Sequence, residues 1–376
     1  QRQNVYKRQA RYIRMGLGFG LILSLFIGGV QAQTPYYEHR KHTSEYNGPG
    51  RDEPVPEDLT EIRIGYFGPA DAEHPTGGDN WLAATVAVEQ VNASGGYHGI
   101  PFKLIQGWSD NPWGTGILRV TRMVYEDRVW AIIGSIDGPS THLAEQVVAK
   151  ARVPLVNPGS TDKTANLANV PWLFSFLPGE HIQVPLLADA LLACAGDAGF
   201  GFLSSVDHDS RVFIRELTRY LTTRKRFPKF HVVYDPRQPN CLETLEQFPP
   251  AGIRAVVIAA PPDEGPVIVE RIRRWGDGVR ILADSSFGRS FFLDRIGQMG
   301  DGIILPYPGT IHSPQDILTE SFRQRWNRTP DFAARQTYDA VLMLAEAVQR
   351  VGLNRVRIRE ELRRLSPWSG SNGQVE

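Results

Sequence analysis

Short apolar segments alternate with amphipathic segments along most of the chain, and this alternation limits the possible folds more than any other feature. The apolar segments have the length of strands and are rich in Val and Ile. Near-continuous Val and Ile content is typical of strands that are covered on both faces, as in parallel sheets made of β-α-β units. We therefore expect an α/β fold with doubly wound parallel sheets. The expected strands are 62–67, 102–106, 129–134, 153–156, 201–205, 231–234, 255–260, 279–283 and 302–306, and the expected helices are 79–92, 115–127, 140–151, 181–194, 210–223, 265–275, 314–326 and 333–351.

The first 32 residues differ from the rest in charge. They contain five basic and no acidic residues, whereas residues 33–376 contain 36 basic and 41 acidic residues. The basic residues precede an apolar stretch from Met15 to Val30, an order typical of a secretory signal and short for a membrane-spanning helix. We expect export to the periplasm with cleavage after Ala32, the alternative being a retained membrane anchor. Residues 33–60 are poor in apolar side chains and are expected to form a flexible tether.

Charge and motifs exclude several functions. The mildly negative balance after residue 32 argues against a nucleic-acid binder, which needs a concentrated basic face. The sequence has no phosphate-loop, zinc-protease or serine-hydrolase motif, so we expect neither an enzyme nor a cofactor or metal. Cys194 and Cys241 either pair in an oxidising compartment or stay free. The arginine-rich segment 355–364 is expected to be a solvated helix face.

Two loops stand where a strand ends and a helix begins. Residues 134–141 and 157–162 combine Gly, Ser and Thr with free backbone N–H groups. In open α/β sheets such junctions bind ligands, and a helix N-terminus favours an anion. The alternative is that these hydroxyls only cap helices. Because the two loops follow successive strands, they are expected to converge on one carboxylate.

Five sequence blocks occur in order along the chain: IGYFGP at 64–69, EQVNASGGYHG at 89–99, VWAIIG at 129–134, VPLVNPGST at 153–161, and 322–341. In this combination the chain resembles the periplasmic solute-binding proteins of branched-chain-amino-acid ABC transporters, a leucine-binding-protein-like group with the type I periplasmic binding fold. The resemblance implies two parallel-sheet lobes joined by three crossovers. Their expected bounds are 61–179 plus 309–365 for the first lobe, 180–308 for the second, and 366–376 for the start of a truncated last crossover.

The resemblance also implies a ligand site between the lobes. Gly138 stands where the family often has a serine, so that Ser140 would have to supply the missing hydroxyl. An acidic group for an ammonium is expected in the second lobe, where Ser285 takes the usual place and Asp284 precedes it. Arg211 would pair with a second carboxylate or stay solvated. The residues implied for the ligand are Gly138, Pro139, Ser140, Gly159, Ser160 and Thr161 for its carboxylate, Asp284, Ser285 and Arg211 in the second lobe, and His74 and Trp81 near its side chain.

The resemblance implies an exported binding protein. We expect a monomer that captures a small polar ligand, an amino acid or related small carboxylate, and delivers it to an ABC permease in the inner membrane. The alternative is a sensory or regulatory ligand-binding protein of the same fold coupled to a membrane receptor. A third hypothesis is a hydrolase with a degenerate cleft that uses Ser140 as its nucleophile.

Overall fold

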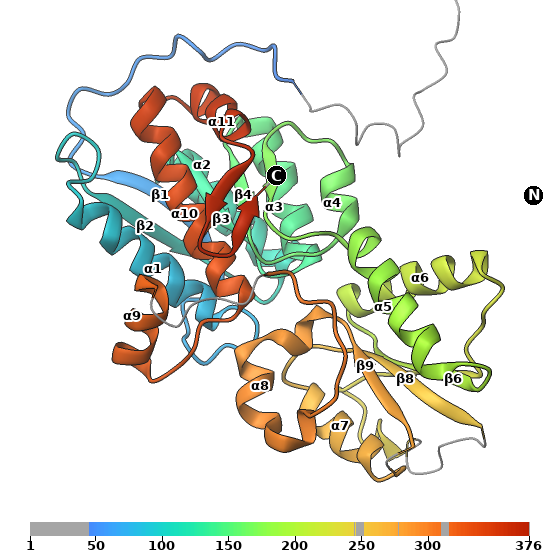
Figure 1. Cartoon of the computed structure of the whole chain (residues 1–376). Helices are drawn as coiled ribbons and strands as arrows, with labels where there is room; N and C mark the ends of the chain where they lie inside the picture. Colours follow the sequence, from blue (N-terminus) through green and yellow to red (C-terminus); the bar gives the residue numbers. More distant parts are fainter. Residues whose placement is uncertain (1–44, 244, 246–251, 277, 310–315, 376) are drawn as a thin grey trace, which may run out of the picture.

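The computed structural model describes residues 45–243, 245, 252–276, 278–309 and 316–375. The expected signal segment and the first part of the expected tether lie outside these residues. Within the described part of the chain, no helix has the length and apolar character needed to cross a membrane. The described elements form two lobes, each built around its own parallel sheet (Figure 1).

The first lobe contains a five-stranded sheet in the order β2-β1-β3-β4-β5, and every neighbouring pair is parallel. Side chains alternate between its faces. Ala131 and Ile133 belong to one core cluster, whereas Ile132 lies in another on the opposite face. The strands are β1 (Ile62–Phe67), β2 (Phe102–Gly107), β3 (Ala131–Gly134), β4 (Leu155–Asn157) and β5 (Leu173–Ser175).

The second lobe contains a four-stranded parallel sheet in the order β7-β6-β8-β9. The predicted strand 302–306 is not formed, because Ile304 makes only a single bridge to Leu282. Cys194 and Cys241 are both free and pack against different core clusters of this lobe, so they do not form a disulfide. The strands are β6 (Gly199–Ser205), β7 (Phe230–Tyr234), β8 (Ile253–Ala259) and β9 (Arg280–Ala283).

Helices cover both faces of each sheet, as the alternating pattern predicts. Helices from the end of the chain pack beside the first helix in the first lobe (Figure 1). That lobe contains α1 (Gly78–Ala93), α2 (Ile117–Tyr125), α3 (Gly138–Ala151), α4 (Lys163–Leu167), α9 (Ile317–Trp326), α10 (Phe332–Val351) and α11 (Arg355–Arg364). The second lobe contains α5 (Glu180–Ala195), α6 (His208–Thr223), α7 (Gly265–Arg273) and α8 (Ser290–Ile296).

The described chain ends in an antiparallel hairpin. It consists of β10 (Trp368–Gly370) and β11 (Gly373–Val375). Asp339 of α10 holds the turn, because its carboxylate accepts the backbone N–H groups of Ser371 at 2.7 Å and Asn372 at 3.0 Å. The exact residues at which the chain changes lobe stay a prediction.

The segment expected as a flexible tether is attached to the first lobe from residue 45 onward. The ring centroids of Tyr46 and Trp172 lie 4.8 Å apart, and the Asn354 amide donates to the Gly50 carbonyl at 2.8 Å. Arg51 also pairs with Glu360 of α11. These contacts offset the ordering cost that the polar composition of the segment predicted to be too large.

Helix α11 is only in part the solvated face that its arginines predicted, because Arg357 and Arg364 are exposed while Arg359 is buried. Arg359 is 3% exposed, and its Nε donates to the Pro171 carbonyl at 2.7 Å. Arg355 donates through Nη2 to the Val129 carbonyl at 2.7 Å. The long side chains of arginine reach past the buried apolar residues of the helix to satisfy carbonyl groups at the ends of the neighbouring elements.

Candidate functional site

A cavity of about 290 Å³ lies between the lobes. Its walls are loops at the carboxyl ends of strands from both sheets, which is where open α/β folds bind ligands. Within the described residues, the walls include His74, Trp108, Asp110, Asp137, Gly159 and Thr161 of the first lobe and Asp207, Asp209, Ala260, Asp284 and Ser285 of the second.

Five of the predicted ligand residues lie on these walls: His74, Gly159, Thr161, Asp284 and Ser285. The structure does not bring the other six to the cavity. Their side chains are buried in other contacts or lie outside it. These six are Trp81, Gly138, Pro139, Ser140, Ser160 and Arg211.

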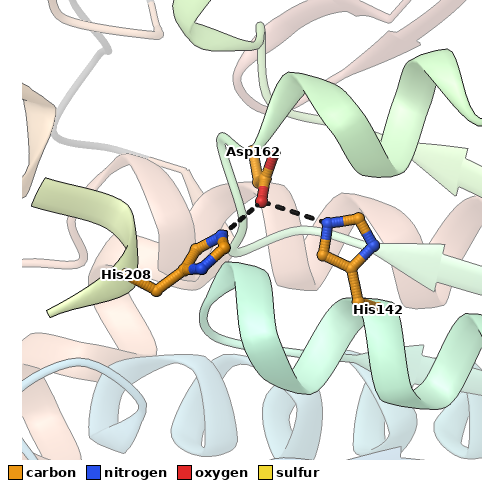
Figure 2. Close-up of side chains that lie close together, drawn as sticks. All are labelled: His142, Asp162 and His208. Atoms are coloured by element: carbon orange, nitrogen blue, oxygen red, sulfur yellow. Dashed lines mark hydrogen bonds and ion pairs between the residues drawn. The ribbon is translucent and has the colours of Figure 1, made fainter. Parts of the chain in front are cut away.

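Beside the cavity, three side chains that the sequence did not single out come together across the lobes. Figure 2 shows the carboxylate of Asp162 between the imidazole rings of His142 and His208. Its Oδ2 lies 3.1 Å from His142 Nε2 and 2.7 Å from His208 Nε2. His208 belongs to α6 of the second lobe, whereas the other two residues belong to the first. We call these three residues the Asp162 cluster.

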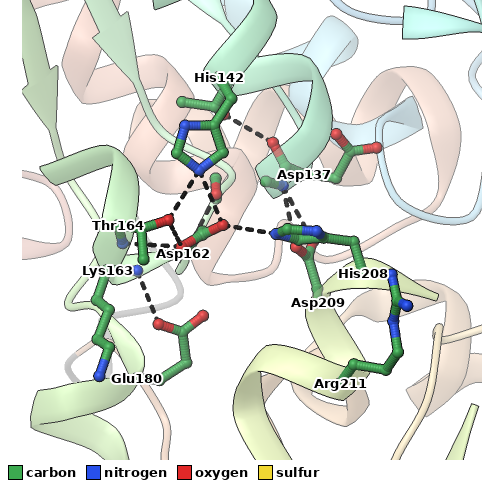
Figure 3. A network of polar contacts seen from close by, with 12 residues as sticks. Asp137, His142, Asp162, Lys163, Thr164, Glu180, His208, Asp209 and Arg211 are labelled. Atoms are coloured by element: carbon green, nitrogen blue, oxygen red, sulfur yellow. Dashed lines mark hydrogen bonds and ion pairs between the residues drawn. The ribbon is translucent and has the colours of Figure 1, made fainter. Parts of the chain in front are cut away.

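The N-terminus of α3, expected to hold a ligand carboxylate, is already satisfied by carboxylates of the protein. Asp137 caps the helix and accepts the Ser140 N–H at 2.8 Å and also its hydroxyl. The Gly138 N–H donates to both carboxyl oxygens of Asp209, at 3.1 and 3.2 Å, and Figure 3 shows Asp209 approaching from α6. In this arrangement the N–H groups of Gly138 and Ser140 are already paired, and the expected anion anchor at Gly138, Pro139 and Ser140 stays a prediction.

The second expected anchor loop is also largely satisfied from within. Asn157 Oδ1 accepts the N–H groups of Gly159 at 3.1 Å and Ser160 at 3.0 Å. The Ser160 hydroxyl accepts the Asp162 N–H at 3.1 Å. Thr161 is the residue of this loop whose side chain stays available on the cavity wall. An incoming carboxylate would therefore meet few free donors on the first lobe.

The acidic residue expected in the second lobe does reach the cavity. Asp284 follows β9 directly, and its Oδ1 accepts the Ser286 N–H at 2.8 Å. Burial raises the pKa of Asp284 to about 7. Ser285 beside it is 7% exposed and also lines the cavity. The shift of the acid by one position from its usual place does not remove it from the wall.

Asp207 and Asp209 are wall residues that the sequence interpretation missed. Asp207 Oδ1 accepts the Ser210 N–H at 3.0 Å, while its Oδ2 is buried and has no hydrogen-bond partner among the described residues. Burial, together with the charges of Asp137 and Asp207, raises the pKa of Asp209 well above its ordinary value. The density of acidic residues at the start of this helix was the available signal. Arg211, which follows, is exposed and donates to the Asp207 carbonyl.

The structure also changes the prediction about which tryptophan lies near the ligand. Trp81 packs against Tyr66 in the first-lobe core, with ring centroids 5.1 Å apart, so it is a packing residue. Trp108 lines the cavity instead, and its indole N–H donates to Asp110 at 2.8 Å. His74 accepts the N–H groups of Thr76 and Gly77 on Nδ1, at 3.2 and 3.0 Å. Burial lowers the pKa of His74, which favours the neutral ring that accepts these bonds.

The chain matches a known protein family. A family model described as periplasmic binding protein matches residues 61–376. The chain belongs to the periplasmic binding protein family. An amino acid binding protein of Pseudomonas aeruginosa is 30% identical over 105 residues, and the match spans only 28% of the length of that relative.

Solved periplasmic binding proteins share the fold at low identity. The branched-chain amino acid transporter protein LivJ of Streptococcus pneumoniae, bound to isoleucine, is 18% identical with a TM-score of 0.74, over 84% of this chain and 91% of LivJ. A solute-binding protein of Rhodopseudomonas palustris bound to 3,4-dihydroxybenzoic acid is 14% identical with a TM-score of 0.70, over 84% and 88%. LivJ is named as a substrate-binding protein and the Rhodopseudomonas protein as a solute-binding protein.

A second group of contacts closes this periplasmic binding protein on another side of the cavity. Arg289 of the second lobe donates through Nε to Asp331 at 2.7 Å and through Nη2 to Asn80 at 2.8 Å and to the Thr76 carbonyl. The side chains of Arg289 and Asp331 are only 5% and 2% exposed. We call these four residues the Arg289 socket. Together with the Asp162 cluster, the socket holds the lobes in a closed form.

Proposed function

We propose that this periplasmic binding protein is exported, captures one small cationic ligand between its lobes as a monomer, and delivers it to an ABC permease. The basic and apolar N-terminal segment supports export. The name of the LivJ relative supports a transport role, because it describes a transporter substrate-binding protein. Closure over the ligand is the mechanism: contacts from both lobes stabilise the closed form, and no bond is made or broken.

The proposal that the ligand is cationic rests on the acidic side chains that line the cavity. Within the described residues, Asp110, Asp137, Asp207, Asp209 and Asp284 line it, and Arg289 is the one wall residue with a permanent positive charge. The Arg289 guanidinium is already used by Asp331, Asn80 and Thr76. A small anion would thus meet a wall of carboxyl groups, and the one guanidinium among the described residues of that wall is already paired.

An alkylammonium group fits the same wall. Within the part of the chain that the structure describes, the buried Oδ2 of Asp207 has no partner, and leaving such an oxygen unpaired costs about 1–3 kcal/mol. An ammonium group carries three N–H donors and supplies what this oxygen lacks. The cavity volume of about 290 Å³ lies near the lower end for small-molecule sites. We therefore propose a ligand of the size of a basic amino acid or a short polyamine.

A binding screen tests the proposal. The full-length mature protein is heated with lysine, arginine and putrescine as cations, isoleucine and leucine as neutral amino acids, and glutarate and 3,4-dihydroxybenzoate as anions. At one hundred times its dissociation constant a ligand stabilises the native state by about 2.7 kcal/mol. We expect at least one cation to raise the melting temperature and the anions to leave it unchanged.

The variant Asp207→Asn tests whether Asp207 binds the cationic ligand. We expect affinity for the cation to fall by about tenfold or more, because a charge-assisted hydrogen bond to a partly buried carboxylate is lost. Asp197→Asn, an exposed aspartate of the same lobe, is the matched control and should bind normally. Tightest binding of an anion, or an unchanged affinity of Asp207→Asn, overturns the assignment of a cationic ligand.

A further inference from the structure

The Asp162 cluster contains three metal-ligating side chains from three separate parts of the chain. His142 lies on α3, Asp162 follows β4, and His208 begins α6. One nitrogen or oxygen from each lies within 4.8 Å of the others (Figure 2). The cluster bridges the lobes, since α6 belongs to the second lobe and the other two elements belong to the first.

The spacing of these atoms suits one tetrahedral metal ion. Zn²⁺ binds imidazole nitrogen and carboxylate oxygen at about 2.0–2.2 Å, which sets neighbouring ligand atoms about 3.3–3.5 Å apart. Asp162 Oδ2 lies 3.1 Å from His142 Nε2 and 2.7 Å from His208 Nε2. The three ligand atoms all lie within 4.8 Å of one another, so movements of the side chains would bring them around one ion. The histidine side chains are 25% and 34% exposed, which leaves a route for the ion from solvent.

Outer contacts orient two of the three side chains. His142 Nδ1 lies 3.4 Å from Glu145 Oε2, an arrangement that directs Nε2 toward Asp162. Asp162 Oδ1 accepts the Thr164 N–H at 2.8 Å and the Thr164 hydroxyl at 2.6 Å, which leaves Oδ2 for the histidines. Figure 3 shows Thr164 beside this carboxylate, with its hydroxyl oxygen also 2.8 Å from His142 Nε2, a contact that His142 would exchange for the ion. Metal-binding histidines and carboxylates are commonly held by such second partners.

Glycine at position 138 makes room for the cluster. A Cβ built there would lie 2.9 Å from Asp162 Oδ2 and 2.9 Å from His208 Cδ2, and 2.5 Å from Asp209 Oδ1. Any larger residue at Gly138 would therefore push the second lobe away from Asp162. The close approach of His208 therefore depends on the absence of a side chain at position 138.

We propose that His142, Asp162 and His208 bind one Zn²⁺ ion, with water in the fourth position, and that this ion joins the two lobes in the closed form. An ion that binds only the closed form shifts the equilibrium toward it by its own binding energy. By the same linkage, Zn²⁺ and a ligand in the cleft increase each other's affinity. The inference does not depend on which ligand the cleft binds.

Metal titration tests the site. Calorimetry of the full-length mature protein with ZnCl₂ should show one ion per chain bound by the cluster. His208→Ala and His142→Ala should each weaken this binding more than about tenfold, because each removes a direct ligand. His98→Asn is the matched control: His98 is an exposed first-lobe histidine with a positive φ of 51°, which asparagine also adopts. It should bind the ion as the wild type does.

Two further measurements test metal binding and closure of the lobes separately. Co²⁺ in place of Zn²⁺ should give the visible absorption of a tetrahedral site in the wild type and His98→Asn, and lose it in His208→Ala. Small-angle X-ray scattering should show a smaller radius of gyration with Zn²⁺ in the wild type only, with circular dichroism confirming that each variant is folded. Unchanged Zn²⁺ affinity in folded His208→Ala overturns the site. Binding without compaction overturns the joining of the lobes.

Discussion

The Arg289 socket and the Asp162 cluster both join the lobes, but they do so with different chemistry. In the socket, Arg289 and Asp331 are 5% and 2% exposed, and the guanidinium keeps its charge at every physiological pH. In the cluster, the two histidines are 25% and 34% exposed, and imidazole is a common metal ligand. The socket is therefore a constant contact, whereas under our proposal the cluster makes closure depend on the metal ion in solution.

The largest effect is expected from breaking the constant contact. Arg289→Ala leaves the Asp331 carboxylate without its partner whenever the lobes close. Truncating one member of a buried, hydrogen-bonded charge pair at an interface costs about 2–5 kcal/mol. We expect the closed form to lose about that much stability, measured as a larger radius of gyration in X-ray scattering and a weaker affinity for the cleft ligand.

Arg325→Ala is the control for this prediction. Arg325 pairs with Glu89 on the surface, where the side chains are 40% and 55% exposed, and such pairs contribute about 0–1 kcal/mol. Arg325→Ala should close normally. Equal effects of the two arginine variants would show that the buried socket is no stronger than a surface pair.

A smaller effect is expected from separating the lobes at the cluster alone. Gly138→Ser places a side chain 2.5 Å from Asp209 and 2.9 Å from Asp162 and His208. Overpacking of this kind costs about 1–3 kcal/mol. We expect reduced closure in scattering while the Arg289 socket stays intact. Gly278→Ser is the control, because a Cβ there meets no atom within 4 Å; if both serine variants close equally well, the tight approach at Gly138 does not limit closure.

The smallest expected effect is the pH dependence of ligand affinity, which we assign to Asp284 on the cavity wall. Burial raises the pKa of Asp284 to about 7, so this carboxyl is neutral below that value and charged above it. A cationic ligand prefers the charged form, and its affinity should rise with pH through this range, by up to about tenfold from pH 6 to pH 8. Titration calorimetry at several pH values measures this.

Asp284→Asn should abolish that rise, because the amide does not ionise in this range. Asp294→Asn, an exposed aspartate of the same lobe, should keep it. A pH profile that is the same in Asp284→Asn and in the wild type would place the titrating group elsewhere. The pH dependence of ligand affinity would then not arise at the part of the cavity wall formed by Asp284 and Ser285.

The regular elements were predicted best where apolar periodicity was long. Strand β1 has the predicted bounds Ile62–Phe67, and α10 begins one residue before the predicted helix. Short elements were not predicted. Helix α4 (Lys163–Leu167) and strand β5 (Leu173–Ser175) contain too few residues to show a hydrophobic period. The predicted strand 302–306 failed because a strand needs a continuous neighbour, and only Ile304 meets β9.

The candidate site was predicted in part, and the errors share one cause. Asp284 and Thr161 reach the cavity because each follows a strand end, a position that sequence periodicity reveals. The expected anchors Gly138 and Ser140 lie off the cavity wall, and Asp209 and Asp137 accept their N–H groups. A sequence lists donors and acceptors without saying which of them are already paired.

The sequence by itself determined the α/β class, the order of most strands and helices, and the family, because these follow from local periodicity and from blocks of neighbouring residues. Only the tertiary structure shows that acidic side chains line the cavity and that His142, Asp162 and His208 lie close together. Both depend on how two lobes pack, and thus on distances between residues far apart in the chain. Electrostatic and metal-binding chemistry varies steeply with such distances, whereas sequence patterns record only neighbours along the chain.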